Sequence, residues 1–172
     1  MNTSIVLTIM ADDKPGIIQT VSSTLRKHGG SWTQSSMSSL AGQFAGILLA
    51  TVPTENSVAC QQELSGLESQ GLRVIAHIGK SVMTTEETKT YVLDLVGNDR
   101  QGIVSDIAAV LTSHNVNVRE FESVVEAASM GGGELFRASA ELLVPVSTDI
   151  DALESELEAL ANDLMVDISF RK

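Results

Sequence analysis

Two short turns carry the side chains whose chemistry could bind a small charged molecule. Each turn combines an acidic residue, a basic residue and a glycine: Asp13, Lys14 and Gly16 in the first, Asp99, Arg100 and Gly102 in the second. Each follows an apolar strand pattern and precedes an apolar helical pattern, so each glycine is expected at a helix start. Free helix amides attract a carboxylate there, and a nearby aspartate can pair with an ammonium group. The two turns therefore predict a receptor for a zwitterion.

A structural interpretation of the same residues stays open. Asp12 or Asp13 can cap the first helix, whose first turn tolerates Pro15, and Asp99 can cap the second. The glycines would then only allow close packing of helix on sheet. In that case Lys14 and Arg100 are solvated and clamp no carboxylate.

The two turns belong to an internal repeat. Gly16 and Gly102 are 86 positions apart, and the same spacing continues to the pairs Leu25/Leu111 and His28/His114. A period of about half the chain is too long for a solenoid and predicts two homologous domains. We expect them at 1–80 and 89–172, joined by a linker at 81–88, which lacks sustained periodicity.

The first half predicts the order β-α-β-β-α-β. The apolar strand is followed by a helix whose packed face is expected to contain Ile17, Ile18, Val21 and Leu25. A polar stretch at 31–40 suits an edge strand, Ala41-Gly42 a hairpin turn, and 44–52 its second strand. The weaker second helix is expected to use Val58, Leu64 and Leu67, and the last strand Leu72, Val74, Ala76 and Ile78.

The second half repeats this order. Ile103, Ile107 and Leu111 mark its first helix, and the stripe of Ile150, Leu153, Leu157, Leu160 and Leu164 marks its second. The hairpin between them spans 117–125 and 135–144, and its turn is six residues longer than in the first half. The glycine-rich insertion at 130–133 predicts a flexible hairpin, with a mobile lid or partner contact as the alternative.

A β-α-β-β-α-β unit whose first turn reads Asp-Lys/Arg-Pro/Gln-Gly-Ile resembles the ACT domain, a small regulatory module that binds amino acids. The resemblance implies an α+β chain of two tandem ferredoxin-like domains, each an antiparallel four-stranded sheet with two helices on one face. Two such domains filling a chain of this length are similar to the glycine cleavage system transcriptional repressor group.

The resemblance also implies where a ligand would lie. In amino-acid-binding ACT domains it lies between this turn and the beginning of the second strand of a neighbouring domain. The corresponding positions are Asp13, Lys14, Gly16 and Ser31 in the first half, and Asp99, Arg100, Gly102 and Asn117 in the second. We expect the second set to be the better receptor, because Asn98, Asp99 and Asn117 would offer donors and acceptors around the same corner. Glycine and serine are the first ligands to try.

Charge and composition exclude several classes of protein. The net charge of −11 repels phosphate backbones and anionic lipids, so neither direct nucleic-acid binding nor a membrane location is expected. The chain has no long apolar segment and begins without a signal peptide pattern, which predicts a cytoplasmic protein. Cys60 is the single cysteine, and His28 and His114 suit helix ends better than a metal site. No cofactor or metal is implied.

The sequence contains no catalytic motif, such as HExxH, CxxC or GxSxG. It predicts a non-catalytic regulatory protein that senses a small amino acid and acts through a protein partner, such as a DNA-binding transcription regulator. The alternative is an assembly module of the same fold that no longer binds a ligand. Small domains with polar edge strands also predict a homo-oligomer.

Overall fold

The computed structural model describes residues 1–79, 86–128 and 133–172, which form two compact units, Met1–Val82 and Met83–Lys172. Most of the predicted linker, residues 81–85, lies outside the described residues, and Thr88 already belongs to a strand. Most of the predicted glycine-rich insertion, residues 130–132, lies outside them too.

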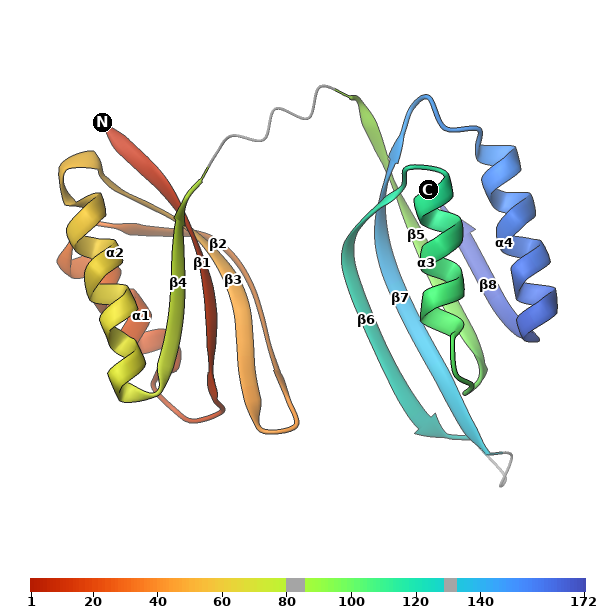
Figure 1. Ribbon diagram of the computed structural model, residues 1–172, viewed down its shortest axis with the longest axis horizontal. Coiled ribbons are helices and arrows are strands. Elements are labelled where there is room, and N and C mark those ends of the chain that lie inside the picture. Colours follow the sequence, from red (N-terminus) through yellow and green to blue (C-terminus); the bar gives the residue numbers. More distant parts are fainter. Residues whose placement is uncertain (80–85, 129–132) are drawn as a thin grey trace. The chain divides into compact units, whose positions relative to one another are not determined.

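Each unit has the predicted order of elements (Figure 1). The first contains β1 (Asn2–Asp12), α1 (Ile17–Lys27), β2 (Ser31–Leu40), β3 (Gln43–Pro53), α2 (Ser57–Gly66) and β4 (Leu72–Ile78), with short 3-10 turns at Thr54–Asn56 and Leu67–Gln70. The second contains β5 (Thr88–Asn98), α3 (Ile103–Ser113), β6 (Asn117–Ala127), β7 (Glu134–Pro145), α4 (Ile150–Leu164) and β8 (Val166–Arg171).

The two sheets have the same topology. Their strand orders are β2-β3-β1-β4 and β6-β7-β5-β8, and every pair is antiparallel. Both helices of each unit cover one face of its sheet (Figure 1). The register shifts at equivalent places, between Trp32 and Gln34 and between Val118 and Glu120. The predicted tandem ferredoxin-like architecture is confirmed, with the polar strand β2 at an edge.

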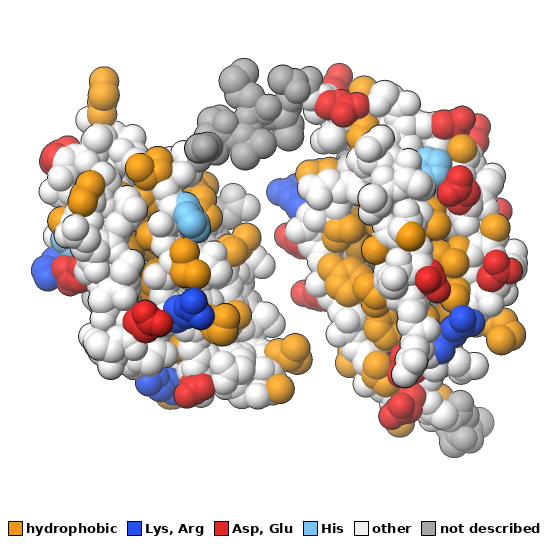
Figure 2. Space-filling view, viewed as in Figure 1, with side chains coloured by type: hydrophobic (Ala, Val, Ile, Leu, Met, Phe, Trp, Pro, Cys, Tyr) orange, Lys and Arg blue, Asp and Glu red, His pale blue; other side chains and the backbone are white. Residues whose placement is uncertain are grey.

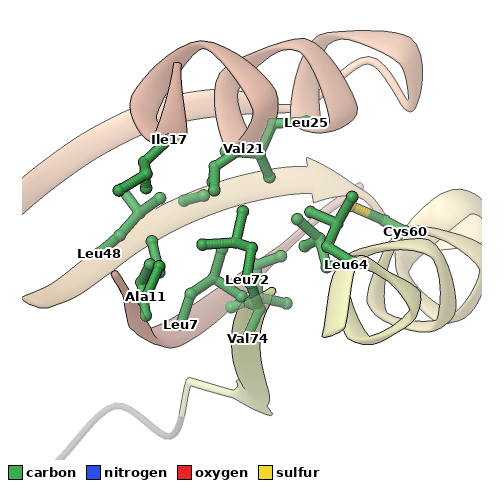
Figure 3. Packing of buried hydrophobic residues seen from close by; sticks show 14 of the residues in the cluster. Leu7, Ala11, Ile17, Val21, Leu25, Leu48, Cys60, Leu64, Leu72 and Val74 are labelled. Carbon is green, nitrogen blue, oxygen red and sulfur yellow. The ribbon is translucent and has the colours of Figure 1, made fainter. Parts of the chain in front are cut away.

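The core of the first unit lies between its sheet and its helices (Figure 3). Ile5, Leu7 and Ile9 alternate along β1 toward the helices, as a strand with one buried face requires. They meet Val21 and Leu25 of α1, together with Cys60 and Leu64 of α2. Burial raises the pKa of the Cys60 thiol, and the nearby Glu63 carboxylate adds to this shift, so Cys60 is a packing residue.

Three predicted core residues of the first unit are exposed. Ile18, Val58 and Ile78 expose 52%, 64% and 61% of their surface. Ile17 and Ile18 are adjacent and point in directions about 100° apart on a helix, so only one of them can face the sheet. Thr24 of α1 and Ser57 of α2 are buried in addition to the predicted apolar residues.

Residues in left-handed backbone conformations end the first helix of each unit. Gly29 has a φ of 72° and Asn115 a φ of 57°, directly after the helix ends at His28 and His114. Glycine and asparagine are the residues that adopt this conformation most readily. The predicted helix ends are confirmed, and each leads the chain into an edge strand, β2 or β6.

Candidate ligand-binding turns

The turns before α1 and α3 have nearly the same backbone. Gly16 has a φ of 102° and Gly102 a φ of 96°, a region that side chains strain. The Gly16 carbonyl accepts the first helical hydrogen bond from the Thr20 amide, and the Gly102 carbonyl accepts it from the Asp106 amide, both at 2.9 Å. Each glycine is therefore the N-cap of a helix whose first amide groups have no partner within the helix.

The aspartates of the turns do not cap the helices, so that prediction is wrong. Neither α1 nor α3 has a side-chain cap, and Pro15 lies before α1 instead of in its first turn. The Asp13 amide donates to the Gly42 carbonyl and the Asp99 amide to the Glu134 carbonyl, both at 2.9 Å. The turns are thus held by the neighbouring hairpin, which leaves the helix amides free.

The side chains of the first turn are already bound within their own unit. The Ser39 hydroxyl donates to Asp13 Oδ2 at 2.5 Å, and Lys14 Nζ donates to the Gln70 carbonyl at 3.4 Å. These contacts tie the turn to β2 and to the end of the 3-10 turn before β4. A ligand would have to compete with them for the same carboxylate and ammonium groups.

The second turn carries uncommitted side chains. Asn98, Asp99 and Arg100 are exposed, and the described part of the chain provides none of the three with a side-chain hydrogen bond or ion pair. A carboxylate, a guanidinium and an amide are therefore available within three consecutive residues. The two turns have the same backbone shape, so they differ in whether their side chains have partners in the rest of the unit.

Ser31 and Asn117 do not lie near the turns of their own units. Asn98 pairs with Leu135 of β7, whereas Asn117 pairs with Leu143, eight residues further along the same strand. At about 3.4 Å per residue, these positions are roughly 27 Å apart. In the first unit, Asp12 pairs with Gln43 and Ser31 with Thr51, the same separation. The expectation that Asn98, Asp99 and Asn117 share one corner is wrong within a unit.

Asp106 of α3 lies beside the second turn and is a residue that sequence reasoning missed. Its Oδ2 lies 3.6 Å from where a Cβ on Gly102 would be, so this carboxylate faces the start of α3. The equivalent residue in α1 is Thr20, whose hydroxyl donates to the Gly16 carbonyl at 2.9 Å. An acid in the first turn of a helix offsets the positive end of its dipole. The sequence could have indicated Asp106 by its position four residues after Gly102, because a side chain there points back toward the helix start.

The opposite helix ends carry the repeated histidines, each beside a glutamate of the other helix. His28 Nε2 lies 2.9 Å from Glu63 Oε2, and His114 Nε2 lies 3.3 Å from Glu156 Oε1. Among the described residues no group of three or more His, Cys, Asp or Glu side chains is arranged to hold a metal ion. These contacts join the two helices of each unit.

Acidic side chains are distributed over several parts of the second unit's visible face, without a single cluster (Figure 2). This unit has two hollows. One, of about 390 Å³, lies on the helix-free face of the sheet near Asp94. The other, of about 600 Å³, lies between α4 and β8. Neither is lined by a residue of the candidate turns. None of the described helices combines the length and apolar character needed to cross a bilayer.

Comparison with solved structures finds other chains of similar fold. A crystal structure of an unknown protein from Galdieria sulphuraria is 25% identical, with a TM-score of 0.88 over 99% of this chain and 98% of the other. A crystal structure provisionally named a glycine cleavage system transcriptional repressor is 17% identical, with a TM-score of 0.67 over 99% of this chain and 97% of the other. A search of curated proteins found no match.

A family model of the ACT domain matches the chain twice, at residues 3–77 and 89–171. The two matches fall on the two βαββαβ units, and each includes one of the glycine turns. The chain therefore belongs to the ACT domain family and contains two copies of the domain.

Proposed function

We propose that this chain is a non-catalytic, cytoplasmic regulator that binds a small amino acid, glycine or serine first, at the turn from Asp99 to Gly102. ACT domains indicate a regulatory role linked to small ligands. The observation that carries the choice of turn is the uncommitted state of Asp99 and Arg100, in contrast to the bound Asp13 and Lys14.

The chemistry of the turn suits both ends of a zwitterion. Arg100 and the amides at the start of α3 attract a carboxylate, as charge-assisted hydrogen bonds favour. Asp99 and Asp106 provide acceptors for the ammonium group. The negative charge of Asp106 also weakens the attraction of the helix start for the ligand carboxylate. Binding therefore requires that the ligand ammonium lie near Asp106 and offset this charge.

Asn117 enters this proposal through a second copy of the chain. Within its own unit it begins β6, at the other end of α3 from Gly102. Its exposed amide could complete the ligand contacts only in a neighbouring ACT domain, as the family arrangement implies. Ser31 occupies the same place at the beginning of β2.

Calorimetry with the intact protein tests the ligand and the turn together. We expect saturable heat with glycine or serine, and a rise in Tm that follows mass action. Asp99→Ala and Arg100→Ala should each abolish most of this binding, and Gly102→Val should obstruct the helix amides. The matched variants Asp13→Ala and Lys14→Ala should bind normally. Loss of binding in the first-turn pair alone would move the site to Gly16.

The proposed output is contact with another protein, such as a DNA-binding transcription regulator. The net charge of −11 opposes the approach of the chain to a duplex at long range. The structure provisionally named a repressor supports the shared fold, and the repressor role is our proposal. Affinity capture from native extract should recover a partner in a ligand-dependent way. A tight, sequence-selective shift of naked DNA by the purified chain would contradict this output.

An assembly module without a ligand is the second candidate. Asp106 favours it, because a carboxylate at the start of α3 competes with the binding of a ligand's own carboxylate. Absence of heat for all twenty amino acids at millimolar concentration would make this the better assignment.

A further inference from the structure

The helix-free face of the first sheet exposes apolar side chains from three neighbouring strands around Thr8, with Arg73 and His77 at its β4 border. In β1, the side chains of Val6, Thr8 and Met10 point away from the helices, because their neighbours Ile5, Leu7 and Ile9 point into the core. Ile47 of β3 and Ile75 of β4 lie directly opposite Thr8 on its two sides. Met10, Ile47 and Ile75 expose 47%, 57% and 43% of their surface. Three adjacent strands thus contribute to one patch, which we call the sheet-1 face.

The second sheet carries polar side chains at the positions equivalent to Thr8, Ile47 and Ile75. Asp94 replaces Thr8, and its two cross-strand neighbours are Ser139 and Ser169 in place of the two isoleucines. Asp94 Oδ1 accepts from the Ser139 hydroxyl at 2.7 Å, and Asp94 Oδ2 lies 2.7 Å from Arg171 Nη2. The fold therefore does not require apolar residues at these positions, because the equivalent sheet is stable with charged and hydroxyl groups there.

The equivalence extends to the edges of the patch. Ala45 and Leu49 on β3 correspond to Arg137 and Glu141 on β7, which form ion pairs with Glu126 and Arg119 of β6. The edge strand β2, in contrast, contains no charged residue along its ten positions. Exposed apolar surface with a polar rim is typical of an interaction site.

Charge indicates which partner fits the sheet-1 face. Copies of a chain with a net charge of −11 repel each other wherever acidic surfaces meet. On the outward positions of the described strands in this sheet, the formal charges are those of Asp12 and Arg73, which are opposite in sign and lie toward the same end. Two copies can therefore meet through this face without bringing acids together. A basic partner would find a single carboxylate, Asp12, whose charge Arg73 offsets at the same end of the face.

We infer that the sheet-1 face packs against the sheet-1 face of a second copy of this chain. The contact is isologous, with Ile47, Ile75 and Met10 of each copy excluded from water at its centre, as in sheet-on-sheet packing. It forms without ligand and uses no residue of the candidate turns, so it is independent of amino-acid binding.

Sedimentation velocity of the full chain across a concentration series tests this inference. We expect the wild type to be dimeric at about 100 µM and to dissociate on dilution, because a contact centred on a few apolar side chains should be weaker than a standard stable interface. The triple variant Thr8→Asp, Ile47→Ser and Ile75→Ser installs the residues that the second sheet carries at the same positions. It should raise the dimer Kd by at least about tenfold.

A control variant separates this effect from a general loss of surface hydrophobicity. Ile18→Ser and Val58→Ser together remove two exposed apolar side chains from the helix side of the same unit, and should leave the Kd unchanged. Circular dichroism should give the same spectrum for all three proteins. A monomeric wild type at about 100 µM, or a triple variant as dimeric as the wild type, would overturn the inference and leave the face to a different partner.

Discussion

The two ACT units have the same fold and differ in the side chains at several equivalent exposed positions. Gly16 and Gly102 share their left-handed conformation, and the register shifts of β2 and β6 fall at equivalent positions. The first unit binds its own turn side chains and exposes an apolar sheet face. In the second, the described residues offer the turn side chains no side-chain partner, and ion pairs and hydroxyl groups occupy the equivalent sheet positions, beside the exposed Val124. The backbone requirements of the fold are thus met in both copies, while the exposed positions have diverged.

This contrast suggests a division of roles within one chain. On our two proposals, the first unit supplies a contact between copies and the second supplies a ligand site. Each depends on positions that the core does not constrain, which is why the two units could diverge there without loss of stability. The following predictions compare equivalent positions of the two units.

The largest effect is expected from opening a cavity in one core. Leu7 and Leu93 are equivalent and almost completely buried. Leu7→Ala or Leu93→Ala should each lower the free energy of unfolding of its own unit by about 2–5 kcal/mol. Hydrogen exchange followed by mass spectrometry should show faster exchange in the substituted unit only. Loss of protection in both units from either substitution would mean that they unfold as one body.

A methyl group at Gly97 should have the next largest effect. A Cβ there would lie 2.3 Å from Val166 Cγ1 and 3.0 Å from Val166 Cα. The equivalent residue of the first unit is Ala11, which faces Leu72 and already carries that methyl group. Gly97→Ala should destabilise the second unit by about 1–3 kcal/mol in urea unfolding, because the neighbouring strand must shift.

A double variant checks the cause of that loss. Gly97→Ala combined with Val166→Ala removes the nearest clashing atom, Val166 Cγ1, although the Cβ at 2.7 Å remains. The two substitutions should therefore together cost less than the sum of their separate costs. Additive costs would show that β8 accommodates the methyl group without contacting Val166.

Loss of a helix cap should have a smaller effect and should affect one unit only. Asp149 Oδ1 accepts from the Ala152 amide at 3.1 Å at the start of α4, whereas Asn56 makes no such bond at the start of α2. Asp149→Ala should cost about 1 kcal/mol, and Asp149→Asn should retain most of the stability. Thermal unfolding of both variants measures the difference, and equal Tm values would argue against the cap.

The smallest effect is expected for the pH dependence of the first unit. The hydrogen bond from Lys27, and then that from His28, hold the pKa of Glu63 below its ordinary value. A carboxyl group with a lowered folded-state pKa contributes stability above its unfolded pKa of about 4.3, and that contribution is lost as the pH falls through the lowered value. Glu63→Gln should therefore reduce the acid-induced loss of stability.

The control for this measurement is Glu68→Gln, a substitution at an exposed glutamate of the same unit. Urea unfolding at several pH values below 6 should give the same slope for this variant as for the wild type. A wild-type slope in Glu63→Gln as well would show that other carboxyl groups account for the acid sensitivity.

Much of the fold could be predicted from local patterns. The repeat, the order of elements and the left-handed helix ends at Gly29 and Asn115 all depend on periodicity and on residues with special backbone preferences. These signals act over a few residues, so they can be read along the chain. The family motif at Gly16 and Gly102 adds the topology, because the same turn recurs at the same step of each unit.

Contacts between distant segments could be decided only by the tertiary structure. Asp13 was one of two candidates to cap α1, yet its carboxylate accepts from Ser39, because the sheet brings the β2–β3 hairpin beside the turn. Asn117 follows α3 closely in sequence, yet α3 carries the chain to the far end of the sheet from Asn98. The face occupied by Thr8, Ile47 and Ile75 likewise exists only because the register aligns three strands. Local sequence determines which element forms, whereas the register between elements determines which side chains meet.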